Sequence, residues 1–189
     1  MRRPELAEFD IDAQQPVIEA IRQGDSYAMT EFVRHNERWV RGVIFGILGR
    51  TSDLDDVVQR VWIQVWREAR RLEDLSRWRH WVYRIARNAA TDVLRRRRRE
   101  KDAIVRKADT PADPGSPADA RLAGREQEQL VLESIAALPE IYREPFVLKH
   151  MEDLSYKEIG ELLGLPSDTV ETRLVRARRL LREQLAGKV

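Results

Sequence analysis

Two short amphipathic helices near the C-terminus carry arginines in a pattern that suits contact with a polyanion. The segment Leu154–Leu181 reads as helix, tight Gly-Leu-Pro-Ser turn, helix. Ser155 and Glu158 have the spacing of a capping box at the start of the first helix. Gly164 is expected to end that helix. The sequence therefore predicts a helix-turn-helix, the supersecondary unit that many proteins use to read DNA.

The second of these helices divides into an apolar side and a basic side. Ser167 or Asp168 is predicted to cap it. The side predicted to be buried consists of Val170, Leu174, Ala177 and Leu181. The side predicted to face solvent carries Arg173, Arg176, Arg178, Arg179 and Arg182. Taken alone, the segment leaves a purely structural helical hairpin as the alternative, since such hairpins are common.

A second basic stretch lies in the middle of the chain. Between Arg84 and Arg99 there are seven arginines and one carboxylate, Asp92, and Arg95–Arg99 are consecutive. Arginine contacts with phosphates release counterions and give salt-dependent binding. The charge run therefore favours contact with nucleic acid, and the alternative is a solvated helix end.

The helix that leads into this stretch shows a second pattern. Its inner stripe is predicted to contain Trp78, Val82, Ile85, Ala86, Ala89 and Val93, and another face presents Trp81, Arg84, Asn88, Thr91 and Arg95. An aromatic ring can stack on a base, and an asparagine amide can make paired hydrogen bonds to a base edge. The face thus suits single-stranded DNA. For Trp78 we prefer a place in the core, whereas for Trp81 and Tyr83 both readings stay open.

An earlier helix, from Ser52 to Trp66, combines acidic and apolar side chains on its outer face. Its buried side is predicted to hold Leu54, Val57, Val58, Val61, Trp62, Val65 and Trp66, and its outer side Asp53, Asp56, Gln59, Arg60 and Ile63. Acidic residues in a first turn stabilise the helix dipole, which is the simpler explanation of Asp53, Asp55 and Asp56. That effect does not explain Ile63. A mixed polar and apolar surface of this kind predicts the docking of a protein partner.

Composition restricts the remaining possibilities. The chain has 189 residues, 42% hydrophobic and 35% charged, with a net charge of +2. No apolar run is long enough to span a membrane or to direct secretion, so a cytoplasmic protein is expected. There is no cysteine, and His35, His80 and His150 are scattered, so we expect no metal site and no cofactor. No nucleophile or general base stands in a recognisable arrangement, which predicts a protein that is not an enzyme and has no small-molecule substrate.

The helical periodicity extends over most of the chain and indicates an all-α fold. We expect two small helical domains joined by a flexible linker. The predicted boundaries are an N-terminal tail over 1–15, a first domain over 16–107, an acidic proline-containing linker over 108–124, and a second domain with the helix-turn-helix over 125–189.

Four motifs in this order resemble those of a known family. They are Asp53–Gln59 (DLDDVVQ), Trp81–Asn88 (WVYRIARN), Leu138–Glu140 (LPE) and Leu154–Ile159 (LSYKEI). Together they look like the successive motifs of bacterial RNA polymerase sigma factors of the extracytoplasmic-function (ECF) type. The resemblance covers nearly the whole chain, from Pro16 to Leu185.

The resemblance implies three binding surfaces. Docking on the core polymerase, at the β′ clamp helices, would use Asp53, Asp56, Gln59 and Ile63. Binding of the minus-ten promoter element would use Leu72, Trp81, Arg84, Asn88, Thr91, Arg95 and Arg96, with a flipped base held by the loop 72–77 and Asn88. Binding of the minus-thirty-five element would use Glu171, Thr172, Arg173, Val175, Arg176 and Arg178. Further implied partners are the β flap of the polymerase and an anti-sigma factor, and the linker would pass through the polymerase cleft.

Three positions depart from the family pattern. Glu171 stands where a basic or small polar residue is more typical, which points to a different promoter preference. Gly160 replaces a common alanine and allows close helix packing, and Leu72 lies where a phenylalanine is expected. Two other functions compete with the resemblance. One is a regulator that reads duplex DNA alone, for which the acidic helix and the Trp81–Arg99 stretch would be superfluous. The other is an interaction protein that only assembles partners.

Overall fold

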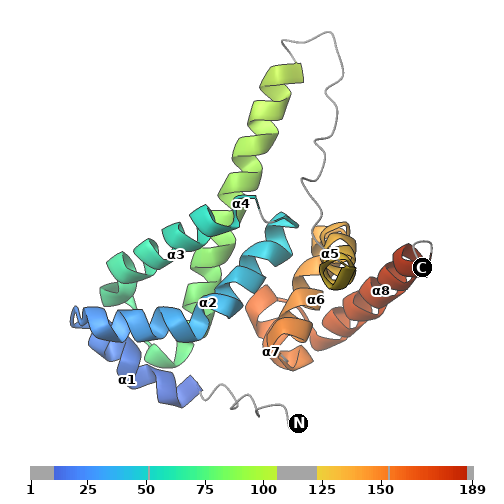
Figure 1. The fold of residues 1–189 in the computed structure, drawn as a ribbon. Helices are drawn as coiled ribbons and strands as arrows, with labels where there is room; N and C mark the ends of the chain where they lie inside the picture. The colour runs from blue at the N-terminus through green and yellow to red at the C-terminus, as the bar shows by residue number, and fades with distance from the viewer. Residues whose placement is uncertain (1–10, 51, 106–122, 153, 187–189) are drawn as a thin grey trace.

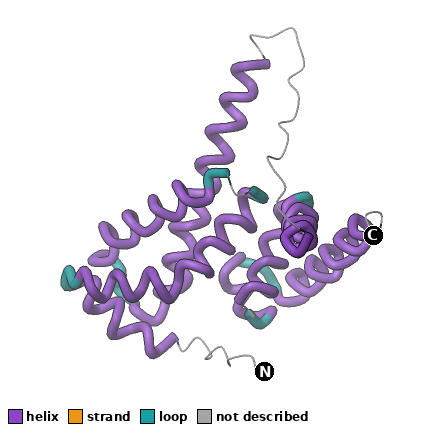
Figure 2. Tube along the Cα trace, in the orientation of Figure 1, coloured by secondary structure: helices purple, strands orange, loops and turns teal. Residues whose placement is uncertain are grey.

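The computed structural model describes residues 11–186 apart from 51, 106–122 and 153. The described residues form helices and connecting turns, with no strand among them (Figure 2). The first helices are α1 (Ile11–Arg22), α2 (Ser26–Leu48), α3 (Leu54–Glu68) and α4 (Trp78–Val105), with two 3₁₀ turns, η1 (Ala69–Arg71) and η2 (Leu75–Arg77). The others are α5 (Ala123–Ala136), α6 (Glu140–Glu152), α7 (Tyr156–Leu163) and α8 (Ser167–Ala186). The all-α prediction is confirmed.

The helices form two blocks, which we call the N-terminal block (α1–α4) and the C-terminal block (α5–α8). Figure 1 shows α2 crossing between α3 and α1, with α4 beside them and its last turns projecting away from the body of the molecule. The C-terminal block lies against the end of α2 (Figure 1). One continuous hydrophobic core runs through both blocks, from Ile18 in α1 to Leu174 in α8. The two blocks are therefore packed together.

Aromatic side chains hold the N-terminal block together. Trp78, at the start of α4, is 1% exposed and packs edge-to-face on Phe32, with ring centroids 5.3 Å apart, and on Trp39, at 6.1 Å. Such pairs add about 0.5–1.5 kcal/mol each to the free energy gained from burial. The preferred reading of Trp78 as a core residue is correct, and its position fixes the start of α4 against α2.

Two boundaries differ from the expected ones. The helix α1 begins at Ile11 and includes Pro16, so part of the predicted tail is helical. Burial of Ile18 and Ile21 stabilises the helix here. Pro16 is tolerated because it is exposed and removes only one backbone hydrogen-bond donor. At the other boundary, α5 begins at Ala123, inside the predicted linker. The rest of the predicted tail, 1–10, and of the predicted linker, up to 122, lies outside the described residues.

The helix-turn-helix is built by local interactions that the sequence encodes. The Glu158 N–H donates to the Ser155 hydroxyl, and the Ser155 N–H donates to the Glu158 carboxylate at 2.8 Å, which completes the predicted capping box. Gly164 ends α7 with a φ of 67°, in the left-handed region that favours glycine. A Cβ at Gly160 would lie 2.5 Å from the Leu165 carbonyl oxygen, so this glycine does allow close packing at the turn.

The start of α8 differs from the prediction. The carbonyl of Pro166 accepts hydrogen bonds from the N–H groups of Thr169 (3.0 Å) and Val170 (3.1 Å), so Pro166 opens the helix. The expected capping by Ser167 or Asp168 is wrong, because both residues already lie in the first turn. There the carboxylate of Asp168 is placed favourably for the positive end of the helix dipole.

Candidate nucleic-acid and protein interfaces

The outer face of α3 carries the acidic and apolar surface that the sequence predicts. Asp56 and Gln59 are exposed, and Ile63 is 51% exposed. Trp66 continues the same line and is 39% exposed, so its predicted burial is wrong. The reason is the helical period: position 66 follows 56, 59 and 63 at steps of three or four and shares their face. This spacing is the signal in the sequence that places Trp66 outside, where it adds a large aromatic side chain to the surface.

Asp53 does not share that exposed surface. Its carboxylate forms an ion pair with Arg97 of α4, and both side chains are about a quarter exposed. As the residue before α3, Asp53 makes no side-chain capping bond to that helix. The neighbouring Asp55 pairs with Arg41 of α2 at 2.7 Å. The tertiary structure thus places the Asp53 carboxylate where it ties α3 to α4.

Along α4, a stripe of polar and basic side chains faces solvent. Arg84, Asn88 and Arg95 are exposed and Thr91 is partly exposed, at helical spacing. Arg95 contacts Asp92 at 3.6 Å in an exposed ion pair, which contributes little to stability. The guanidinium groups of this stripe are accordingly accessible to a phosphate backbone. Arg96 is also exposed and pairs with a carboxylate of the same helix, Glu100, at 3.6 Å.

Two residues expected at the DNA surface lie in the core instead. Leu72 is 7% exposed and Trp81 is 8% exposed. Tyr83, whose role stayed open, is 2% exposed. The first turns of α4 are covered on more than one side, because α1 and η2 pack there in addition to α2 and α3, and Glu144 of α6 contacts Tyr83. In this structure Leu72 and Trp81 support the surface from beneath.

The loop before α4 is shaped by its own hydrogen bonds. Asp74 accepts from the backbone N–H of Ser76 at 3.0 Å and from its hydroxyl at 2.6 Å. These bonds lower the pKa of Asp74 and keep it ionised. The pKa of His80 is also lowered, first by burial and then by the charges of Arg77 and Arg84. The imidazole next to this loop is therefore held in its neutral form near pH 7.

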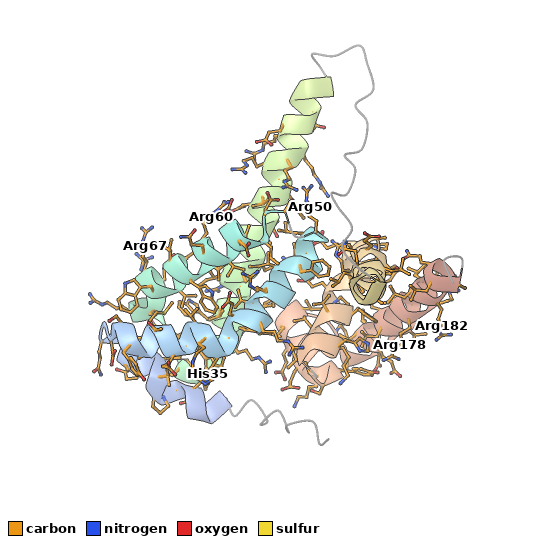
Figure 3. The ribbon with its side chains drawn as sticks, viewed as in Figure 1. His35, Arg50, Arg60, Arg67, Arg178 and Arg182 are labelled. Atoms are coloured by element: carbon orange, nitrogen blue, oxygen red, sulfur yellow. The ribbon has the colours of Figure 1, made fainter. Side chains whose placement is uncertain are left out.

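The outward face of α8 carries most of the side chains predicted to contact bases. Glu171, Thr172 and Arg176 are exposed and Val175 is 57% exposed. Arg173 and Arg178 are both partly exposed on the same helix, and Figure 3 shows Arg178 with Arg182 further along it. The predicted burial of Val170, Leu174 and Ala177 is confirmed, whereas Leu181 is only partly buried.

A groove of about 710 Å³ lies between this face and the start of α6. Ile141, which is 51% exposed, and Tyr142 form its α6 side. Neither residue is among those predicted from the sequence. The signal that could have identified Ile141 is its position directly after Leu138-Pro139-Glu140, where an apolar side chain stands at the exposed start of a helix. Arginine can pair with guanine and an aliphatic side chain can contact the thymine methyl group, so α8 presents chemistry that suits a major groove.

Within the described ranges, no three His, Cys, Asp or Glu side chains gather in a way that could hold a metal ion. No helix in the described part of the chain is both long and apolar enough to cross a membrane.

Each of the two blocks matches a known protein family. Residues 32–100 match the family described as Sigma-70 region 2, and residues 128–181 match Sigma-70, region 4. The first match covers α3 and most of α4, and the second covers the helix-turn-helix.

Similar full-length proteins come from several bacteria. The ECF RNA polymerase sigma-E factor of Haemophilus influenzae is 30% identical over 180 residues, which are 90% of this chain and 94% of the relative. The RNA polymerase sigma-H factor of Pseudomonas aeruginosa is 30% identical over 183 residues, 92% of this chain and 94% of the relative. The ECF sigma factor SigW of Bacillus subtilis is 28% identical over 177 residues, with 89% and 94% covered.

Two solved structures share the fold. CnrH in complex with the cytosolic domain of CnrY has a TM-score of 0.69 at 24% identity and covers 94% of this chain and 100% of its own. The sigma factor RpoE of Bartonella quintana in complex with the anti-sigma factor NepR has a TM-score of 0.64 at 22% identity, with 83% and 96% covered. The level of identity to sigma factors along almost the whole chain, together with the two matched regions, shows that this protein belongs to the family of ECF RNA polymerase sigma factors.

Proposed function

We propose that this protein binds core RNA polymerase, directs it to specific promoters, opens the minus-ten region and so starts transcription of a stress or signal regulon. The observation that carries the proposal is the presence of three separate surfaces on one chain. An acidic and apolar helix face suits a protein partner, and two basic helix faces suit DNA. A protein that reads duplex DNA alone would need only one of these surfaces.

For the polymerase, we propose the face of α3 formed by Asp56, Gln59, Ile63 and Trp66, against the β′ clamp helices. An exposed isoleucine and tryptophan next to carboxylates provide an apolar centre with a polar rim, the usual anatomy of a protein interface. Asp53 belongs to this proposal as a residue that holds α3 in place through its ion pair with α4. The β flap is the proposed second contact of the polymerase, with the C-terminal block.

For the minus-ten element, we propose that Arg84, Asn88, Thr91, Arg95 and Arg96 contact the DNA. The loop over 72–77 stands beside this stripe and would receive a flipped base. Extrusion of a base costs a few kcal/mol, which stacking and hydrogen bonds to the base edge can offset. Leu72 and Trp81 would act by supporting the loop and the helix.

For the minus-thirty-five element, we propose that α8 enters the major groove. Glu171, Thr172, Val175 and Arg176 are the side chains nearest the bases, and Arg173 and Arg178 contact phosphates. A carboxylate at Glu171 can accept a hydrogen bond from a cytosine amino group.

The two blocks are the proposed domains, and we propose that the acidic segment between them, predicted over 108–124, is the linker. We propose that the protein acts in the cytoplasm, where its polymerase is, that it is not an enzyme, and that it needs no cofactor or small-molecule substrate. The structural relative from Bartonella quintana is bound to an anti-sigma factor, so an anti-sigma factor is a proposed partner here too.

Transcription in vitro tests the proposal. Purified core polymerase and a genomic promoter library are combined with the intact protein or with Asp56→Arg, Asn88→Ala or Arg176→Ala. We expect specific transcripts at full level from the intact protein and at a reduced level, or not at all, from the three variants. Asp56→Arg should abolish binding to core, whereas Arg176→Ala should keep core binding and lose about 1–3 kcal/mol of promoter affinity, or about fivefold to 150-fold.

Arg34→Gln is the matched control, because Arg34 is 67% exposed on α2, outside all three surfaces. Binding to duplex DNA with no transcript that depends on polymerase would instead show a free-standing regulator. Unchanged transcription by Arg176→Ala would contradict the assignment of α8.

A further inference from the structure

Arg143 of α6 joins the two blocks by capping two helix ends at once. Its Nε donates to the carbonyl of Gly46 at 2.9 Å, and its Nη2 donates to that of Ile47 at 2.7 Å, both in the last turn of α2. Its Nη1 donates to the carbonyls of Ala136 (2.8 Å) and Leu138 (2.7 Å) at the end of α5. The last carbonyls of a helix lack partners within the helix and carry partial negative charge. One buried guanidinium therefore satisfies groups from both blocks.

Glu144, the next residue, makes a second connection across the same interface. The Tyr83 hydroxyl of α4 donates to the Glu144 carboxylate at 2.6 Å, and the Arg87 guanidinium lies 3.5 Å from the same oxygen. Glu144 is 7% exposed, and burial raises its pKa. A buried carboxylate is costly unless it is hydrogen-bonded and paired, so these contacts are specific to the packed arrangement.

The backbones of the two blocks approach closely between these side chains. A Cβ at Gly46 would lie 3.3 Å from the Glu144 Cα and 3.6 Å from the Val147 Cβ, both on α6. At Gly49 a Cβ would lie 2.5 Å from the Arg143 guanidinium. The nearest neighbours of an added Cβ at these two positions belong to the C-terminal block. The end of α2 is thus shaped to receive α6.

The same packing brings α7 against the loop before α4. A crevice of about 340 Å³ separates them. Its N-terminal side is basic and its C-terminal side holds carboxylates and leucines; the lining residues are Ser76, Arg77, Arg79, His80, Leu154, Glu158, Glu161 and Leu162. In the packed arrangement, the C-terminal block stands next to the loop that would capture a promoter base.

Packing of this kind conflicts with the geometry of promoter recognition. Elements centred ten and thirty-five base pairs from the start site are about 85 Å apart at 3.4 Å per base pair. The helix α4 is about 42 Å long at 1.5 Å per residue, and α6 contacts its first half through Tyr83 and Arg87. The segment 106–122 can reach at most about 60 Å when extended. Separation of the blocks therefore allows the two DNA-reading helices to reach both elements, whereas the packed form does not.

We infer that Arg143 and Glu144 form a latch that keeps the free protein closed, and that opening this latch is an intrinsic energetic barrier to promoter recognition. The inference rests on the proposed function. Only the open fraction of the protein can bind both elements, so the latch lowers the apparent affinity by that fraction. If about one tenth of the free protein is open, the apparent affinity is about tenfold lower than that of an unlatched form.

Gly46→Gln is the variant that tests the latch most directly. The added side chain would collide with α6, and glutamine is a better helix former than glycine, so α2 itself should be retained. Arg34→Gln introduces the same residue on the exposed side of α2 and serves as the control. Arg143→Met is the second variant, although it also removes a cap within the C-terminal block.

The distance between the blocks can be measured directly, because the chain has no cysteine. Thr30→Cys on α2 and Arg182→Cys on α8 introduce sites for a pair of spin labels on the outer sides of the two blocks. We expect one narrow distance distribution in the otherwise unaltered full chain and in Arg34→Gln, and a longer, broader distribution in Gly46→Gln. In transcription with core polymerase, Gly46→Gln should reach half-maximal transcript at a protein concentration about twofold to tenfold lower.

Two results would overturn the latch: an unchanged distance distribution in Gly46→Gln, or an opened distribution with the same concentration dependence of transcription. Either result can be obtained while the proposed function is correct. Failure of that function would appear separately, as the absence of promoter-specific transcripts with the unaltered protein.

Discussion

At the scale of single residues, Glu144 links the closed arrangement to pH. Burial holds the pKa of this carboxyl above its ordinary value, and the nearby Glu140 acts in the same direction. The Tyr83 hydrogen bond and the charge of Arg87 oppose that shift, and Arg143 on the same helix turns its guanidinium to the end of α2. The raised pKa means that closing the blocks takes up a proton.

The expected consequence is a closed form favoured by acid. A group with a raised pKa in the closed form contributes most below the ordinary carboxyl pKa, and its contribution is lost as the pH rises through the raised value. The labelled Thr30→Cys and Arg182→Cys protein should therefore show a larger open fraction at about pH 8 than at about pH 5. Glu144→Gln, which cannot titrate, should flatten this dependence. An equal pH dependence in both proteins would exclude Glu144 as the group responsible.

At the scale of helices, the ion pair between Asp53 and Arg97 couples the proposed polymerase-binding helix to the proposed DNA-binding helix. The two side chains are 44 residues apart in the chain and about three-quarters buried. Another Nη of Arg97 is buried without a hydrogen-bond partner, so the carboxylate is an important partner of this guanidinium. Loss of the pair should loosen α3 relative to α4.

Asp53→Asn is expected to lower the free energy of unfolding by about 1–3 kcal/mol, because a charged hydrogen bond is lost and a partly buried guanidinium is left behind. Urea denaturation of the full chain measures this change. Asp55→Asn is the matched control: its side chain is 82% exposed, so a change within about 0.5 kcal/mol is expected despite its ion pair with Arg41. The double variant with Arg97→Met separates the pair's coupling from each residue's other contacts. Equal losses at Asp53 and Asp55 would contradict the coupling.

At the scale of the whole molecule, a net charge of only +2 conceals separated charges. The basic stripe on α4 and the arginines of α8 face outward, while carboxylates of α6 and α7 lie between the blocks, next to basic side chains of the N-terminal block. The arrangement predicts that DNA binding depends strongly on salt.

Replacement of Arg95 or Arg96 by glutamine tests this expectation. Removal of one phosphate interaction should reduce the slope of log affinity against log salt by about 0.7–0.9. The measurement is promoter binding by the holoenzyme at a series of salt concentrations, with Arg34→Gln as the control. A parallel decrease in affinity at every salt concentration would argue against phosphate contacts at these positions.

Much of the fold could be predicted because it depends on local interactions. The capping box at Ser155, the left-handed Gly164 and the apolar stripes of α3 and α8 each arise within a few residues. The structure confirms them, except that Trp66 is exposed and Leu181 is only partly buried. The family motifs were likewise readable in order along the chain. The main differences at this level are the start of α1, which lies at Ile11 within the predicted tail, and the start of α8 at the carbonyl of Pro166.

The sequence by itself thus determined the helices, their order and the types of surface that the chain carries. The tertiary structure alone decided that Leu72 and Trp81 are covered and that Asp53 pairs with Arg97. It also brought Arg143 to Gly46, 97 residues earlier in the chain. The physical reason is that helical periodicity specifies which residues share a face, whereas the burial and pairing of that face depend on elements distant in sequence that pack against it.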